Sequence, residues 1–385
     1  MVADKTAWLD GRITDEGLAY MRSFIGVEQP VRGWNSTANL DAILHFIIGI
    51  GDDNPLYWDE AYAAGSSWGG VVAPPAFLYS CSSGGTWKGQ GTPSMAQQFL
   101  PGTFGLWAND RWQYYSNVHA GERVTVTTQV YDVQEKRSSF SGRSATNTEK
   151  TTYMGGDGRV VAHQYRTILR FERSGSRERG RYMDIPPAHY SEEEQAQIRA
   201  QYELEPKQRR GAEPRFWEDV SEGEPLTTLV KGPLTVTSIA GWLMGWGSPL
   251  CQTNRIANEY LKEYPTARLY NQETGIEDTL EGAHWDSYLA QQSGMARGYD
   301  FGAQRISWMS HLVTDWMGDD AFLTDLHVQL RRPNLLGDIS WLTGKVTVKR
   351  KKDSHTLVDL ELTSTNQRNE VNTSGTATVR LPTRG

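Results

Sequence analysis

The chain has 385 residues, enough for two or three domains, and its 38% apolar and 22% charged residues exclude a disordered or fibrous protein. Its formal net charge of −7 argues against nucleic acid as a partner, because nucleic-acid-binding proteins carry basic surfaces. Its two isolated cysteines form no metal or redox motif, and no apolar run is long enough for a membrane helix. We therefore expect a cytoplasmic protein without a metal site, a redox cofactor or a membrane partner.

In the amino-terminal part, helical patterns precede a series of strand patterns. Residues 40–51 cluster apolar side chains before a glycine-rich turn, and residues 76–83 have a second, shorter helical pattern. The hydrophobic period then changes to two in four segments rich in β-branched and aromatic residues, 103–115, 122–133, 139–154 and 159–171. The sequence GGDG before the last segment predicts a hairpin turn.

A surface linker is predicted in the middle of the chain. Residues 174–225 are dominated by Gly, Ser, Arg, Glu and Pro. One short helix is expected inside it, because Ser191 can cap the helix start and Glu194 stands three residues further on.

The carboxyl-terminal part repeats the order of helix and strands. Residues 235–247 predict a helix, and residues 248–280 read as an irregular insertion. Residues 302–316 predict a helix whose apolar side chains form a stripe on one face. Four strand-like segments follow at 321–332, 339–351, 355–365 and 371–382.

This order, a helix and then several strands, occurs twice and predicts an α+β fold rather than a doubly wound parallel sheet. We expect two modules, at residues 12–173 and 226–383. In each module a long antiparallel sheet would wrap around a central helix.

The most specific string is IGIGDDNPLYWDEAYAAG, residues 48–65. It resembles the hydratase signature of MaoC-like proteins, G-D-x-N-P-apolar-H, with Asp52 and Asn54 in place and Tyr57 where the signature has His. In the second half, HWDSYLA resembles the end of the same signature through His284 and Asp286. The chain thus resembles MaoC-like acyl dehydratases and (R)-specific enoyl-CoA hydratases, with an amino module similar to FAS1-like dehydratases.

The resemblance implies a double hot-dog fold and a hydro-lyase. The expected reaction is the reversible hydration of a 2-enoyl-CoA thioester to the 3-hydroxyacyl-CoA. CoA enters only as part of the acyl-CoA substrate, and no other cofactor is implied. Hot-dog modules usually pair, and a fused chain can pair internally, so the resemblance leaves both a monomer and a homodimer open.

In this family an Asp/His pair holds the water, and a backbone N–H at the start of the central helix polarises the thioester oxygen. A helix N-terminus suits that task, because its unpaired N–H groups carry partial positive charge. The resemblance makes His284 the expected base and the Gly302 N–H the expected oxyanion donor. The acid stays open among Asp278, Glu281 and Asp52.

Each of the remaining candidate residues could have a structural role instead of a catalytic or substrate-binding one. Tyr57 is a candidate catalytic group or a packing substitute for the missing His. Asn54 and Asp286 are candidate substrate-binding residues, although Asp286 also suits a helix cap and Asp52 a turn. His311, in the middle of the 302–316 helix, is expected to be structural.

Two other functions remain open at this stage. A hot-dog thioesterase would use an Asp or Glu to direct water at the thioester carbonyl. A non-catalytic acyl-binding protein or partner subunit would follow if both halves have lost the Asp/His pair.

Overall fold

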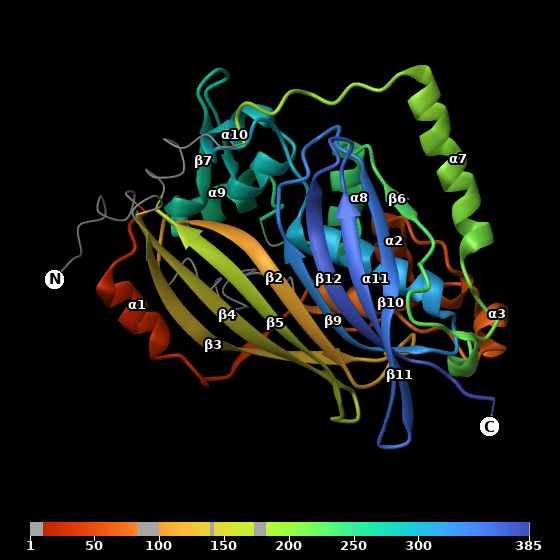
Figure 1. The fold of residues 1–385 in the computed structure, drawn as a ribbon. Helices are drawn as coiled ribbons and strands as arrows, with labels where there is room; N and C mark the ends of the chain where they lie inside the picture. Colours follow the sequence, from red (N-terminus) through yellow and green to blue (C-terminus); the bar gives the residue numbers. More distant parts are fainter. Residues whose placement is uncertain (1–10, 83–99, 139–141, 173–181, 249, 385) are drawn as a thin grey trace.

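The computed structural model describes residues 11–82, 100–138, 142–172, 182–248 and 250–384 (Figure 1). A ten-stranded sheet, with antiparallel pairing throughout, has the order β1-β3-β4-β5-β2-β9-β12-β11-β10-β6. The amino half contributes β1 (Gln29–Val31), β2 (Phe104–Tyr114), β3 (Val124–Ser138), β4 (Gly142–Gly155) and β5 (Val160–Phe171). The carboxyl half contributes β6 (Leu229–Lys231), β9 (Phe322–Leu330), β10 (Ser340–Lys352), β11 (His355–Thr365) and β12 (Val371–Arg380). The predicted α+β class is confirmed.

The long strands overlap the segments predicted from the period-two patterns, although residues 139–141 at the start of one predicted segment lie outside the described ranges. The GGDG sequence forms the turn between β4 and β5, in which the Gly158 N–H donates to the Gly155 carbonyl at 3.0 Å. The two halves meet where β2 pairs with β9, from Asn109 opposite Gln329 to Gln113 opposite Asp325. The two halves therefore share one continuous hydrogen-bonded sheet.

Helices cover the concave side of this sheet (Figure 1). The structure describes α1 (Asp15–Arg22), α2 (Leu40–Ile50), α3 (Glu60–Ala64), α4 (Leu78–Ser82), α7 (Glu192–Gln208), α8 (Val236–Trp246), α9 (Asn254–Glu263), α10 (Ser287–Gln292) and α11 (Gly302–Met317). Helices α2 and α8 pack so closely that a Cβ on Gly245 would lie 2.5 Å from the Cα of Phe46. A glycine is required there because only a residue without a side chain allows that approach.

Helix α11 is the central helix of the carboxyl half. The sequence predicted one apolar stripe, but every residue from Ala303 to Met317 is buried. The predicted stripe is buried, but it is incomplete, because α11 is covered on several sides, by β9, β10 and β12 and by α2 and the 3-10 turn Pro75–Phe77. Its polar residues are therefore buried as well, among them His311 and Asp315.

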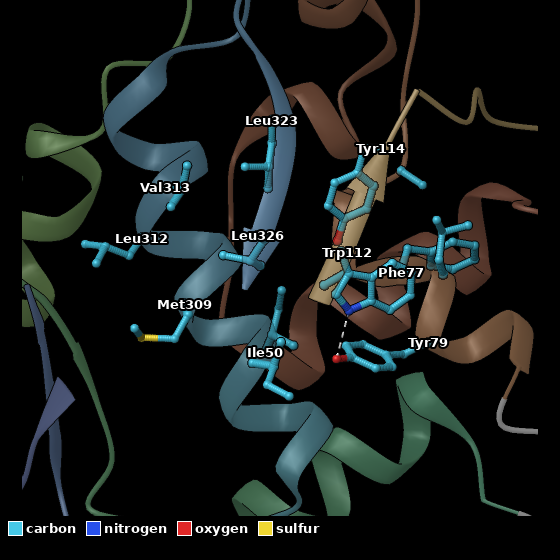
Figure 2. Close-up of a cluster of buried hydrophobic side chains, with 14 of the residues drawn as sticks. Ile50, Phe77, Tyr79, Trp112, Tyr114, Met309, Leu312, Val313, Leu323 and Leu326 are labelled. Carbon is cyan, nitrogen blue, oxygen red and sulfur yellow. Dashed lines mark hydrogen bonds between the residues drawn. The ribbon is translucent and has the colours of Figure 1, made fainter. Parts of the chain in front are cut away.

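The matching helix of the amino half is described as far as residue 82. Its described part consists of the 3-10 turn Pro75–Phe77 followed by the five residues of α4. Tyr79 of α4 meets Trp112 of β2 edge to face, with ring centroids 4.9 Å apart, and its hydroxyl accepts from the indole N–H (Figure 2). Trp112 in turn stacks on Tyr114. These rings, together with Phe77, form the core between α4 and the sheet.

The insertion at 248–280 was expected to be irregular, and this expectation is wrong. It contains α9 and a hairpin of β7 (Arg268–Asn271) and β8 (Ile276–Thr279). A small separate cluster of Tyr260, Leu261 and Ala267 stabilises it. The two four-residue strands are too short to show a period, whereas the amphipathic pattern of α9 is present in the sequence and was missed.

The linker contains the predicted helix, α7. Ser191 and Glu194 form the expected capping box, each side chain accepting from the other residue's N–H. Helix α7 packs beside β6 (Figure 1). The limits of the linker at 174 and 225 stay a prediction. Within the described ranges, no helix combines the length and the apolar character needed to cross a membrane.

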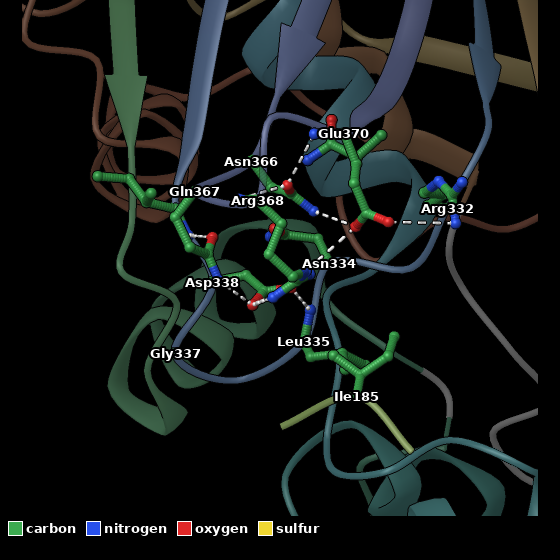
Figure 3. Close-up of polar contacts among 12 residues, drawn as sticks. Ile185, Arg332, Asn334, Leu335, Gly337, Asp338, Asn366, Gln367, Arg368 and Glu370 are labelled. Carbon is green, nitrogen blue, oxygen red and sulfur yellow. Dashed lines mark hydrogen bonds and ion pairs between the residues drawn. The ribbon is translucent and has the colours of Figure 1, made fainter. Parts of the chain in front are cut away.

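The turn before β10 is held by a buried carboxylate (Figure 3). Gly337 has a φ of +93°, a conformation that favours glycine. Asp338 is fully buried and accepts two hydrogen bonds of 2.8 Å from the guanidinium of Arg368. It also accepts from the N–H of Leu335 at 3.1 Å. This ion pair fixes the loop that leads into the outer strands of the carboxyl half.

Candidate active site

A narrow pocket lies beside the GDDNP turn of the amino half, residues 51–55, and residues of both halves line it. It is lined by the turn, by the Pro74–Pro75 segment and by the end of α11, and it includes Asn54, Tyr57 and Asp319. Its cavity volume is about 40 Å³, which is room for two or three water molecules. The signature residues Asn54 and Tyr57 therefore line a pocket that admits water.

The local sequence explains the shape of the turn. Helix α2 ends at Gly51, whose φ of +66° turns the chain away from the helix. Asp52 then accepts the N–H of Asn54 at 3.0 Å, and Asn54 accepts the N–H of Leu56 at 3.0 Å. Both residues thus hold the turn, as the structural reading of Asp52 expected.

Asp319 is a site residue that the sequence reasoning missed. It follows the end of α11, is 4% exposed and lines the pocket. Its carboxylate accepts from the Asn54 amide at 3.0 Å and from the Tyr62 hydroxyl at 2.6 Å. Its partners precede it by more than 250 positions, so no local spacing could have indicated the contact.

Tyr57 is a buried donor in this pocket. Burial raises the pKa of its hydroxyl well above the usual value, and the nearby carboxylate of Asp52 raises it further. Thr314 of α11 opposes this shift, but it does not cancel it. Tyr57 therefore stays protonated at neutral pH and can donate a hydrogen bond, but it is a poor base.

Asp52 faces away from this pocket, into a buried polar cluster. Its Oδ1 lies 3.6 Å from Nε2 of His311, which in turn lies 3.3 Å from Oδ2 of Asp315. Burial raises the pKa of Asp52 above its usual value. His311 was expected to be structural, and the structure places it against one of the signature carboxylates.

His284 lies at the other end of α11. Its Nδ1 is 2.7 Å from the carbonyl oxygen of Tyr299, so Nδ1 carries the proton and Nε2 the lone pair. Its ring stacks on Phe301, with centroids 3.7 Å apart. Burial lowers the pKa of His284 to about 4. At neutral pH the ring is therefore uncharged, the state that a general base requires.

The three acidic candidates near His284 have other partners. Glu281 accepts from the hydroxyl of Ser248 and from the thiol of Cys251, and burial raises its pKa to about 7. Asp278 accepts the N–H of the next residue at 2.7 Å, and burial raises its pKa. Asp286 caps α10, accepting the N–H of Tyr288 at 2.8 Å.

Gly302 begins α11, but its surroundings are filled. A Cβ on Gly302 would lie 2.8 Å from Cβ and Cγ of Trp107, a residue of β2 in the other half. This end of α11 is nine residues from His311, about 13 Å along the helix axis. The structure thus brings His284 close to Gly302 and Asp52 close to Asn54 and Tyr57, but it keeps these two groups apart.

The comparisons with known proteins agree with the fold and the motif. Residues 23–164 match the family model described as FAS1-like, dehydratase domain region. A probable enoyl-CoA hydratase alpha subunit of Thermomonospora curvata is 25% identical over 152 residues, which are 37% of this chain and 47% of that protein. The matched part thus spans about half the length of the curated relatives.

Solved structures resemble the whole chain. A MaoC-like dehydratase with 15% identity has a TM-score of 0.61, with 94% of this chain and 99% of that chain covered. A Mycobacterium tuberculosis protein described as a double hotdog fold has 11% identity and a TM-score of 0.53, with 92% and 95% covered. The predicted double hot-dog fold and the resemblance to MaoC-like dehydratases are confirmed.

Proposed function

We propose that this chain catalyses the reversible hydration of a 2-enoyl-CoA thioester, and that the reaction takes place in the pocket beside the GDDNP turn. The observation that carries the proposal is the buried carboxylate of Asp319, held by Asn54 at the wall of a water-sized pocket. The reaction needs a group that takes a proton from water as the oxygen adds to Cβ and then returns that proton to the α-carbon, and a donor that stabilises the enolate oxygen in between. Asp319 is suited to the first task.

The second task falls to a side chain in this pocket. Pro74 and Pro75 stand before α4 and have no N–H, so neither can donate to a thioester oxygen. The hydroxyl of Tyr57 lines the same pocket and stays protonated. We assign to it the hydrogen bond to the thioester oxygen, in place of the backbone N–H that the family uses.

A wider hollow next to the pocket suits the CoA part of the substrate. Its cavity volume is about 470 Å³, and it shares Trp68 and Phe322 with the inner pocket. Arg159 and Arg380 both line it. Arg159 is paired with Glu122 at 2.8 Å, whereas the guanidinium of Arg380 lies 5.2 Å from the centre of the Phe322 ring. Arg380 is therefore the better placed of the two for a CoA phosphate.

The test compares variants of both halves in the hydration of crotonyl-CoA, followed by the loss of enoyl absorbance. Asp319→Asn and Tyr57→Phe are each expected to lower kcat by about 100-fold or more. His284→Gln is expected to stay within a few-fold of wild type, as is Tyr131→Phe, a control at an exposed tyrosine. If His284→Gln abolishes hydration and Asp319→Asn does not, the reaction takes place at His284 and our assignment is wrong.

The CoA hollow has its own test. Arg380→Met is expected to raise KM for crotonyl-CoA and to leave KM for the pantetheine thioester unchanged, because that substrate lacks the nucleotide phosphates. Equal effects on both substrates would contradict the assignment.

A thioesterase is the second candidate, since a carboxylate such as Asp319 can also direct water at the thioester carbonyl. It would release free thiol, which DTNB detects and hydration does not produce. A chain that neither hydrates nor hydrolyses enoyl-CoA, alone or as a homodimer, would be an acyl-binding or partner subunit.

A further inference from the structure

Four titratable side chains meet at a junction of three helices. Asp52 follows α2, Glu205 comes from the linker helix α7, and His311 and Asp315 stand one turn apart on α11. We call these four residues the junction cluster. Nε2 of His311 lies 3.3 Å from Asp315 Oδ2, 3.6 Å from Asp52 Oδ1 and 3.6 Å from Glu205 Oε1.

The contacts with Asp52 and Glu205 are too long for hydrogen bonds, and the contact with Asp315 is an ion pair when His311 is protonated. His311 is 1% exposed, and neither of its ring nitrogens has a hydrogen-bond partner among the described residues. A buried imidazole without a partner is costly, because it loses its contacts with water and gains none in return. The ring nitrogen instead lies among three carboxylate oxygens at similar distances.

The cluster also has an excess of negative charge. Two cations face it from outside: Arg209 contacts Asp315 Oδ1 at 3.2 Å, and Lys231 lies 3.5 Å from Glu205 while donating to the Gly51 carbonyl at 2.7 Å. The cluster has three carboxylates, and only these two cations face them. One negative charge is therefore uncompensated when His311 is neutral and all three carboxylates are ionised. Arg209 contacts the other oxygen of Asp315, so Oδ2 remains directed at the histidine.

The distances fit ligands around a common metal ion. With bonds of about 2.1 Å, neighbouring ligand atoms of a tetrahedral zinc site are separated by about 3.4 Å. The histidine-to-carboxylate distances are 3.3 and 3.6 Å, and ligand atoms of Asp52, His311 and Asp315 all lie within 4.8 Å of one another. One imidazole with carboxylates is a ligand set for zinc or manganese rather than for a soft metal.

We propose that the junction cluster binds one divalent ion, such as Zn²⁺ or Mn²⁺, with Asp52, His311 and Asp315 as ligands, while the Glu205 oxygen that faces His311 pairs with Lys231. From the sequence we expected no metal site, and Asp52 is separated from the two α11 residues by more than 250 positions, so these residues form no short metal-binding motif. The ion acts structurally: it ties α11 to the turn that carries Asp52 and Asn54. This proposal is independent of the proposed reaction.

The test uses the full chain, purified without an immobilised-metal column. After EDTA treatment and desalting, Zn²⁺ and Mn²⁺ are added separately, and bound metal and Tm are measured. About one equivalent of one of these ions is expected to bind, with Tm rising by about 3 °C or more. Co²⁺ in the same site is expected to give visible absorption that adding Zn²⁺ removes.

Two variants and a matched control locate the ion. His311→Gln and Asp315→Asn are expected to lower metal affinity at least tenfold. The control is Asp53→Asn, which makes the same change at a carboxylate that is 70% exposed and contacts Arg209. The Asp53→Asn protein is expected to bind metal like wild type. Wild-type protein that binds none of the three ions and shows no Tm shift would overturn the proposal, whether or not the variants fold. Unchanged metal binding in both folded variants would also overturn it.

Discussion

Asp110 of β2 lies in the core of the amino half with none of its surface exposed. Tyr79 and Gln164 both donate hydrogen bonds to its Oδ2, whereas Oδ1 has no hydrogen-bond partner among the described residues. Burial raises the pKa of this carboxyl group from 3.8 to about 7, although the two hydrogen bonds and the charge of Arg166 oppose the shift. The substitution Asp110→Asn keeps the size of the side chain and removes its titration.

The pKa shift of Asp110 determines how strongly, and in which direction, its contribution to the free energy of unfolding changes with pH. A carboxyl group with a pKa of about 7 when folded and about 4 when unfolded holds a proton more tightly in the folded state. Its contribution to stability is therefore present at low pH and is lost as pH rises from about 4 to 7. Three pKa units correspond to about 4 kcal/mol, or about 1.4 kcal/mol for each pH unit in that range.

Urea unfolding followed by tryptophan fluorescence, at pH 5, 6, 7 and 8, measures this effect. The free energy of unfolding of Asp110→Asn, relative to wild type, is expected to rise by about 1.4 kcal/mol per unit from pH 5 to 7 and then to level off. Asp184→Asn removes an exposed carboxylate and serves as the control. A difference between Asp110→Asn and wild type that is the same at pH 5 and pH 8 would refute the reasoning.

Three further predictions concern packing and a buried charge. Gly302→Ala would push a Cβ to 2.8 Å from Trp107 and is expected to cost about 1–3 kcal/mol in urea unfolding; an unchanged midpoint would contradict the close contact. Gly245→Ala would separate α8 from α2, where its Cβ meets the α2 backbone at 2.5 Å, and is expected to lower Tm by several degrees. Arg368→Met would leave the buried Asp338 without its cation, at a cost of about 3–5 kcal/mol at pH 7, and a loss below 1 kcal/mol would be inconsistent with the ion pair.

The fold could be predicted where the signal is local. The long strands, the GGDG turn and the capped helix α7 each depend on residues within a few positions of one another. The apolar stripe of α11 was only partly informative, because the polar residues on its other faces are buried against α2 and the sheet. The hairpin β7–β8 could not be predicted, because its strands of four residues each are too short to show a hydrophobic period.

The site was less predictable, because its contacts join distant parts of the chain. The turn made by Asp52 and Asn54 is local and was expected. The contact of Asn54 with Asp319 and the approach of His311 to Asp52 exist only after α11 has packed beside α2. Likewise, Trp107 covers Gly302 from the opposite half, which no motif around Gly302 could indicate.

The pairing of β2 with β9 determines where the sheet has its edges. Both are long strands, and they occupy the middle of the sheet, while its two edges are β1 and β6, of three residues each. Either half produced alone would expose β2 or β9 as an open edge, a template for pairing with other chains. Joining the two modules in one polypeptide thus protects the chain from aggregation, since each half covers the edge that the other would leave open.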